Sequence, residues 1–231
     1  MRTSFWTRLL DVISPRTCTI CDERLSANEQ VLCAKCHMHL PLTHYEQSPF
    51  DNPLCRLFWG QFPIERAAVL FSYEPQSPTS QMIYNMKYRS MPEVGEGLGM
   101  ITARQFAEAG FFEGIDLLVP VPITRRRQWQ RGYNQSMEIA RGVQEVTGLT
   151  ICHRALHRVH FQESQTEQHV WERLQNVENA FRLVAPERIA GKHILLIDDI
   201  ITTGATIIAC GRELAKAEGV KISVLAIGYT K

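Results

Sequence analysis

Two adjacent carboxylates, Asp198 and Asp199, follow the apolar run 193–197, and a small loop rich in hydroxyl groups comes directly after them. A short β-branched run is typical of a buried parallel strand, and in open α/β sheets ligands bind beyond the carboxyl ends of the strands. Carboxylates at such a strand end suit the hydroxyl groups of a sugar or a hydrated Mg²⁺. An ordinary buried strand is the alternative, but adjacent buried carboxylates without a ligand are costly.

The loop after the carboxylates has the composition of a phosphate site. A helix pattern starts within it, and the free N–H groups of a helix start, together with the helix dipole, favour a phosphate. Its glycine lets the backbone approach an anion, and its threonine hydroxyls can donate to phosphate oxygens. The predicted phosphate-binding residues are Thr202, Thr203, Gly204, Ala205 and Thr206. Together with the carboxylates, this loop predicts a sugar-phosphate ligand.

Four cysteines near the amino terminus form two Cys-x-x-Cys pairs with eleven residues between them. Each pair can present two thiolates to one ion from a tight turn, and two pairs complete a tetrahedral zinc site. A structural zinc would contribute folding energy to a segment too small for a core of its own. A redox pair or chance cysteines are the alternatives. The predicted zinc ligands are Cys18, Cys21, Cys33 and Cys36, whereas Cys55 has no such partner.

A basic stretch, residues 119–136, leaves a predicted strand end and so should reach the same edge of the sheet as the carboxylates. Residues 122–158 contain seven Arg and two Glu. Arginine can bind diphosphate through bidentate contacts, and aromatic rings can stack on bases. We expect Arg125 and Arg126 to hold phosphate, and the candidates for nucleic-acid contact are Arg127, Trp129, Arg131, Tyr133, Asn134 and Gln135. A solvated arginine loop is the alternative.

The bulk properties describe a globular protein, with 231 residues, 45% hydrophobic and 21% charged. The net charge of +1 gives the whole molecule no strong attraction to polyanions. No apolar run approaches the length that crosses a membrane, and the first residues lack the apolar core of a signal peptide. We therefore expect a cytoplasmic protein whose seven cysteines are metal ligands or buried thiols rather than disulfides.

Strand and helix patterns alternate along most of the chain, which indicates an α/β fold with a mostly parallel sheet flanked by helices. The expected strands are 67–73, 116–122, 149–152, 193–199 and 221–228. The expected helices are 5–12, 80–88, 93–110, 135–147, 171–180 and 205–218. Lys87, near the end of one of them, is a further candidate for binding diphosphate, or a surface lysine. We expect an amino-terminal helix and zinc-finger module (1–44), a linker (45–65) and a larger domain (66–231).

The segment Ile194–Thr206 resembles the phosphoribosyl-diphosphate (PRPP) motif of type I phosphoribosyltransferases. That motif is an apolar strand, two acidic residues, an apolar pair and then Thr-Thr/Ser-Gly-x-Thr. The resemblance implies a type I phosphoribosyltransferase-like fold, with Mg²⁺ accompanying PRPP. It also implies that Asp198 and Asp199 hold the ribose 2′ and 3′ hydroxyls and that the loop 202–206 holds the 5′-phosphate.

The wider set of motifs resembles the ComF/GntX family over nearly the whole chain. The set comprises the cysteine pairs, Lys87-Tyr88, the Val-Pro-Val-Pro of 119–122, the Arg-Gly-Tyr-Asn-Gln of 131–135, the Gln-rich and Asn-rich stretch 162–181, and the PRPP motif. The family is linked to DNA uptake in natural transformation or to the use of DNA as a nutrient. The resemblance therefore implies single-stranded DNA and the DNA-uptake machinery as partners, and a module similar to a double zinc ribbon.

Three functions are compatible with these motifs. The first is a phosphoribosyltransferase, in which an acceptor attacks C1 of the ribose as diphosphate leaves and nearby carboxylates stabilise the developing positive charge. The second is a non-catalytic competence factor that binds single-stranded DNA, with an affinity that falls steeply with salt. The third is a regulator that senses PRPP without turning it over.

Overall fold

The computed structural model describes residues 15–159 and 180–230, and its centre is a five-stranded parallel sheet. The strand order is β1-β7-β6-β2-β3, and every neighbouring pair is parallel. The strands are β1 (Ile64–Ser72), β2 (Leu117–Pro120), β3 (Thr150–Ile151), β6 (His193–Ile201) and β7 (Lys221–Tyr229). Helices connect β1 to β2, β2 to β3 and β6 to β7, whereas the described part of the connection from β3 to β6 contains β4, β5 and η2. The predicted parallel α/β fold is confirmed.

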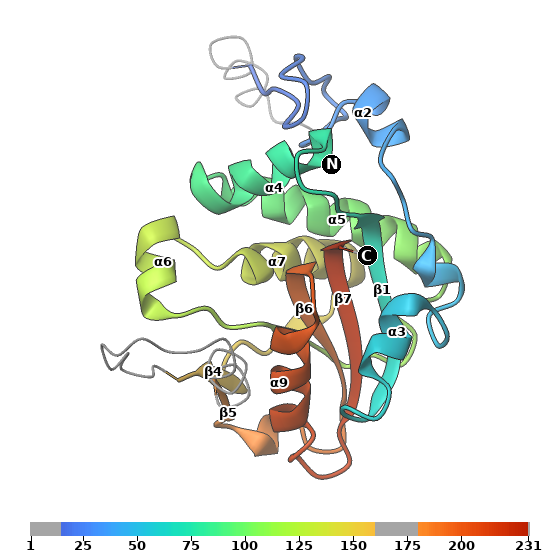
Figure 1. The fold of residues 1–231 in the computed structure, drawn as a ribbon, viewed down its shortest axis with the longest axis vertical. Helices are drawn as coiled ribbons and strands as arrows, with labels where there is room; N and C mark the ends of the chain where they lie inside the picture. Colours follow the sequence, from blue (N-terminus) through green and yellow to red (C-terminus); the bar gives the residue numbers. More distant parts are fainter. Residues whose placement is uncertain (1–14, 160–179, 231) are drawn as a thin grey trace.

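Helices cover both faces of this sheet (Figure 1). Helices α5 (Pro92–Glu108) and α7 (Gln135–Thr147) pack together on one face, and α3 (Pro53–Phe58) and α9 (Ala205–Leu214) lie on the other. The remaining elements are α2 (Ala34–Met38), η1 (Tyr45–Gln47), α4 (Pro78–Tyr88), α6 (Arg125–Arg131), η2 (Pro186–Arg188), and the antiparallel pair β4 (Leu156–Arg158) and β5 (Phe181–Leu183). None of the helices in the described residues is long and apolar enough to span a bilayer.

Two expectations about local structure need correction. Strand β6 continues to Ile201, two residues beyond the expected end at 199, so Asp198 and Asp199 lie within the strand rather than at its end. The expected arginine loop is helical over Arg125–Arg131, because Thr124 caps it by accepting a hydrogen bond from the Arg127 N–H group and Gly132 ends it at φ 82°. The helix expected at 5–12 and nearly all of that expected at 171–180 lie outside the described residues.

The cysteine-containing segment packs directly on α4 and α5. A Cβ atom at Gly97 of α5 would lie 2.5 Å from Val31 Cγ1, so only glycine permits this approach. The Asn85 side chain of α4 donates a hydrogen bond to the Thr19 carbonyl at 3.3 Å. The two parts of the molecule therefore share one apolar core.

The segment expected as a linker also packs on the larger domain. Helix α3 is capped by Asn52, which accepts from the Cys55 N–H group and donates to the Ala67 carbonyl of β1 at 2.8 Å. Cys55 itself is buried at 1% exposure. This segment holds α3 against β1 and, through α3, supports the loop before α9.

Candidate ribose-phosphate site

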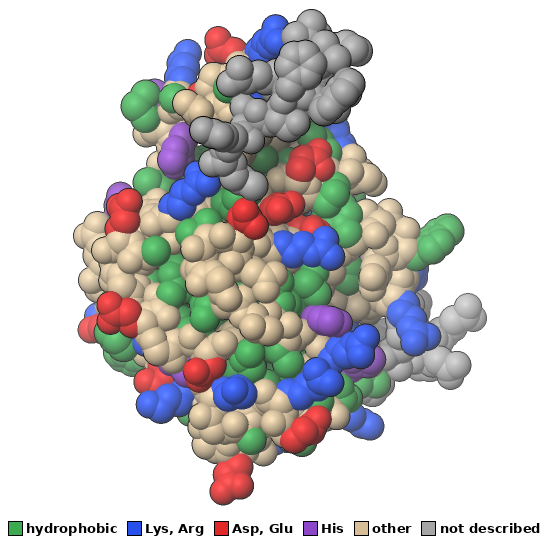
Figure 2. Space-filling view, turned by 180° about the vertical axis from the view of Figure 1, so that it is seen from behind, with side chains coloured by type: hydrophobic (Ala, Val, Ile, Leu, Met, Phe, Trp, Pro, Cys, Tyr) green, Lys and Arg blue, Asp and Glu red, His purple; other side chains and the backbone are tan. Residues whose placement is uncertain are grey.

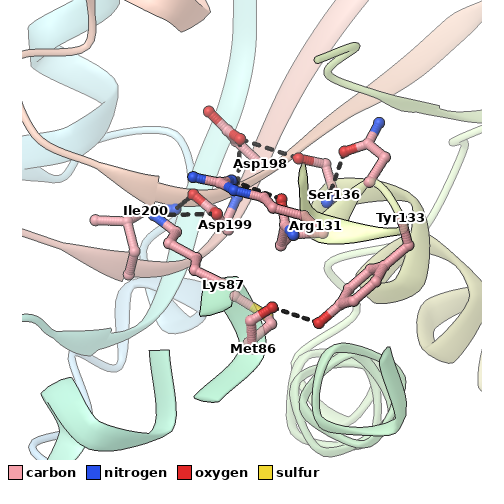
Figure 3. Close-up of polar contacts among 10 residues, drawn as sticks. Met86, Lys87, Arg131, Tyr133, Ser136, Asp198, Asp199 and Ile200 are labelled. Atoms are coloured by element: carbon pink, nitrogen blue, oxygen red, sulfur yellow. Dashed lines mark hydrogen bonds and ion pairs between the residues drawn. The ribbon is translucent and has the colours of Figure 1, made fainter. Parts of the chain in front are cut away.

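The two aspartates of β6 are held by contacts from three different elements (Figure 3). The Ser136 hydroxyl of α7 donates to Asp198 Oδ1 at 3.0 Å, and the Asp199 N–H group donates to the same oxygen at 2.9 Å. Lys87 Nζ of α4 lies 3.1 Å from Asp199 Oδ2, and the Ile200 N–H group donates to Asp199 Oδ1 at 2.6 Å. The carboxyl end of the central strand β6 thus presents two carboxylates with fixed orientations.

The two carboxyl groups differ in charge compensation. Asp199 is paired with the Lys87 ammonium group, whereas Asp198 accepts only from neutral donors among these contacts. Burial and the neighbouring charge of Asp199 raise the pKa of Asp198 to about 7, against the smaller opposing effects of its hydrogen bonds and Lys87. The pair therefore favours the approach of a cation or of hydroxyl donors.

The loop after β6 forms a small pocket of about 40 Å³ lined by Asp198 and residues 200–207. Gly204 begins α9 with φ +78°, a left-handed conformation that glycine adopts at no steric cost. A Cβ atom there would lie 2.8 Å from Leu57 Cδ2, so α3 also requires glycine at this position. Thr202 and Thr203 are exposed at the mouth of the helix start. The pocket has the size and donors for a single phosphate group.

Lys87 lies against Asp199, as expected for a residue of the site, but Arg125, Arg126 and Arg127 of α6 do not line the pocket of the phosphate loop. Arg125 lines a different and larger cavity, of about 1000 Å³, between α6, α7 and β4. Its basic lining residues are Arg125, Arg131, Arg141, His153, His157 and Arg158. Arg126 and Arg127 are exposed on α6 and do not line either cavity.

The Arg-Gly-Tyr-Asn-Gln element mainly fixes structure. The Tyr133 hydroxyl donates to the Met86 carbonyl, and burial raises its pKa to about 12. Asn134 caps α7 and donates to the Val121 carbonyl at 2.9 Å, while Gln135 is 1% exposed and accepts from Arg131 at 2.8 Å. Gln135 therefore faces inward beside Ser136, whereas Tyr133 and Asn134 also line the larger cavity.

The four amino-terminal cysteines form one cluster. The sulfur atoms of Cys18, Cys21, Cys33 and Cys36 all lie within 4.8 Å of one another, and the Cys21 and Cys33 sulfurs are 3.7 Å apart. Four thiolates placed tetrahedrally about 2.3 Å from a central zinc ion would be separated by roughly the distance between the Cys21 and Cys33 sulfur atoms. Within the described residues, this is the one group of His, Cys, Asp and Glu side chains that could hold a metal, so Cys55 takes no part.

Comparisons with known proteins agree with this geometry. A phosphoribosyl transferase domain model matches residues 132–228. The chain is 27% identical over 221 residues to the DNA utilization protein YhgH of Escherichia coli (strain K12), covering 92% of this chain and 90% of that protein. It is 31% identical over 102 residues to competence protein F of Haemophilus influenzae, covering 44% of each. The comparisons support the ComF/GntX family.

Solved structures add nothing to that assignment. Glutamine phosphoribosylpyrophosphate amidotransferase from B. subtilis is 21% identical, with 61% of this chain and 30% of that chain covered and a TM-score of only 0.41. The similarity to the ComF/GntX family therefore rests on the sequence relatives and the phosphoribosyl transferase domain, while the parallel sheet agrees with that domain.

Three groups at the site were not foreseen from the sequence. Ser136 follows the Arg-Gly-Tyr-Asn-Gln element directly, and its place at the start of a helix was the one available signal. Arg141 lies on α7, the next helix after α6, and Arg158 lies on β4, and both line the same cavity as Arg125. Burial and the nearby Arg127 lower the pKa of Arg158. The cavity lining carries four arginines and one glutamate, which gives it a positive excess.

Proposed function

We propose that this ComF/GntX-family chain binds PRPP or another ribose phosphate, with Mg²⁺, at the carboxyl end of β6. The observation that carries the proposal is that Asp198, next to Asp199, lines the same 40 Å³ pocket as the loop at the start of α9. Adjacent carboxylates accept hydroxyl hydrogen bonds, and a helix start beside them holds a phosphate. A ribose 5-phosphate carries both groups on one small molecule.

The residues have separate roles in this proposal. Asp198 and Asp199 accept from the ribose 2′ and 3′ hydroxyls, and the N–H groups and hydroxyls of residues 202–206 bind the 5′-phosphate. Lys87 compensates Asp199 and can move to the diphosphate. Mg²⁺ fits this donor set, because carboxylate oxygens and substrate phosphates are its usual ligands. When bound, it would neutralise charge on the diphosphate.

Phosphoribosyl transfer is the activity that this arrangement favours. The cavity of about 1000 Å³ is close enough to offer space for an acceptor, since its lining residue Pro120 pairs with Ile197 of β6, the residue before Asp198. Attack on C1 of the ribose would then release diphosphate. If the protein binds PRPP but does not turn it over with any acceptor, it would instead be a PRPP-sensing regulator.

A second proposal is that the chain binds single-stranded DNA. The relatives' names, DNA utilization protein and competence protein F, support it, as does the exposure of Arg126, Arg127 and Trp129 on α6. Trp129 is 88% exposed, which suits stacking on an unpaired base. Binding through such arginines should weaken as salt rises. The DNA-uptake machinery would be the source of the strand, and the cytoplasm the compartment.

Calorimetry tests the ribose-phosphate site. PRPP with Mg²⁺ is titrated into the zinc-loaded protein, into Asp199→Asn, and into Asp116→Asn as the matched control, because Asp116 lies at the opposite end of the sheet. We expect binding by the wild type and the control, and a loss of at least about tenfold in affinity for Asp199→Asn, since a charge-assisted contact contributes ~1.5–3 kcal/mol. Absence of binding by the wild type would contradict the proposal.

A further inference from the structure

Helix α4 presents two exposed tyrosines side by side. Tyr84 and Tyr88 are 50% and 63% exposed, although the opposite face of α4 is buried through Met82 and Met86. Their ring centroids are 5.1 Å apart, with 41° between the ring planes. Residues four apart lie on the same face of a helix, one turn from each other. We call Tyr84 and Tyr88 the tyrosine pair.

Arg131 connects the tyrosine pair to the basic cavity. Its guanidinium group lies over the Tyr88 ring, 5.6 Å from the centroid, and the same residue lines the cavity of about 1000 Å³. The one acidic residue in that lining, Glu138, is paired with Arg141 at 2.7 Å. The lining therefore keeps a positive excess. Figure 2 shows Lys, Arg and His side chains gathered at the lower right of that face, on the side of the molecule that carries α6 in Figure 1.

The surface thus alternates flat aromatic groups with cations. We infer that the tyrosine pair, Arg131 and the basic cavity form a binding path for single-stranded nucleic acid, with bases stacked on the tyrosine pair and phosphates in the cavity. Unpaired bases stack on aromatic rings and on guanidinium planes, and phosphates pair with arginine. A duplex offers no free base faces, so the path discriminates against it. This inference rests on the proposed DNA binding and adds residues from α4 to it.

An acidic protein segment is the other ligand that a basic surface attracts. It would use the arginines but would gain little from two adjacent tyrosines that are 50% and 63% exposed. The tyrosine pair thus favours a ligand with planar groups at short, regular intervals, which is the chemistry of a single strand.

Fluorescence anisotropy with a labelled mixed-sequence 20-nucleotide single strand tests the path. The variants are Tyr84→Ala, Tyr88→Ala and Tyr88→Phe, with Phe50→Ala as the matched control, because Phe50 is equally exposed at 60% and lies away from the path. Each tyrosine-to-alanine change should weaken binding roughly tenfold, since stacking on one base is worth about that factor. Tyr88→Phe and Phe50→Ala should bind as the wild type does. Arg131→Gln should lower the salt slope by about one.

Three outcomes would overturn the inference, and each identifies a different step that fails. If the wild type binds the strand but the alanine variants bind equally well, the tyrosine pair plays no part although DNA binding stands. If an abasic strand of the same length binds as tightly, backbone charge alone explains the affinity. If the wild type binds no strand at 50 mM salt, the proposed DNA binding fails as well. The calorimetry of PRPP separates all of these from the ribose-phosphate site.

Discussion

Asp198 and Asp199 are neighbours in the chain, yet the fold gives them different electrostatic surroundings. Alternation along β6 directs them to different sides of the sheet edge, so Asp199 meets Lys87 and Asp198 meets Ser136. Only one of the two negative charges is balanced by a cation. The pair therefore holds a proton near neutral pH, and a ligand that brings a cation or hydroxyl donors replaces that proton.

The pKa of Asp198 leads to a prediction about stability. This carboxyl group has a pKa of about 7 in the folded protein and about 3.8 as its ordinary value, so the folded state binds the proton more tightly. The free energy of unfolding should then fall as pH rises from about 4 to about 7 and level off above that. Asp198→Asn removes the ionisation, so the variant should be more stable than the wild type at pH 8, by roughly 1–3 kcal/mol, and by a clearly smaller amount at pH 5, where only part of the fall has occurred.

Urea unfolding at pH 5 and pH 8 measures this difference. The stability gain expected for Asp198→Asn at pH 8 is smaller than the full pKa shift implies, because the side chain of Asp198 keeps some contact with solvent. Asp116→Asn is the control, and its stability relative to the wild type should not change between the two pH values. Equal effects of Asp198→Asn at both pH values would show that the group is ionised throughout.

At the scale of the elements, the closest approach in the fold joins α5 and α7. A Cβ atom at Gly142 would lie 1.9 Å from the Glu96 carbonyl oxygen, and one at Gly99 would lie 2.2 Å from the Ile139 carbonyl oxygen. Both obstacles are backbone atoms, which cannot move without shifting a helix. The contact fixes α7 and hence the position of Ser136 beneath Asp198.

Substitution of Gly142 by alanine should therefore be strongly destabilising. We expect Gly142→Ala to lower the free energy of unfolding by on the order of 3 kcal/mol or more, because the helices must separate to admit one methyl group. Glu145→Ala, on the exposed face of the same helix, should change it by less than about 0.5 kcal/mol. Urea denaturation measures both. A stable Gly142→Ala variant would mean that α5 and α7 can separate at little cost.

The sequence predicts some of these elements much better than others. Strand β6, the phosphate loop and α9 follow one another within a short segment, so local patterns define them, and the same is true of α7. Helix α6 was expected as a loop, because seven residues rich in arginine carry no apolar stripe. The contacts of Lys87 and Ser136 with the aspartates join residues far apart in the chain, and only the fold specifies them.

At the scale of the whole molecule, the cysteine cluster is connected to the ribose-phosphate site through helix α4. The cysteine-containing segment packs on α4 and α5 through Val31, Gly97 and the hydrogen bond from Asn85 to Thr19. Helix α4 carries Lys87, which contacts Asp199. A metal that orders the cysteine segment therefore also restrains α4. The path from the cysteines to the carboxylates is a continuous series of packed groups.

Removal of zinc should thus loosen α4 before it affects α7. Chelation of the metal, or Cys33→Ser, should lower Tm by about 2–4 °C for each kcal/mol lost and increase hydrogen exchange along α4. PRPP affinity should fall in parallel, because Lys87 no longer holds Asp199. Cys152→Ala is the control, since Cys152 lies outside the cluster, and it should leave exchange in α4 unchanged. If the metal-free protein keeps both its α4 protection and its PRPP affinity, the cysteine segment folds and acts independently of the ribose-phosphate site.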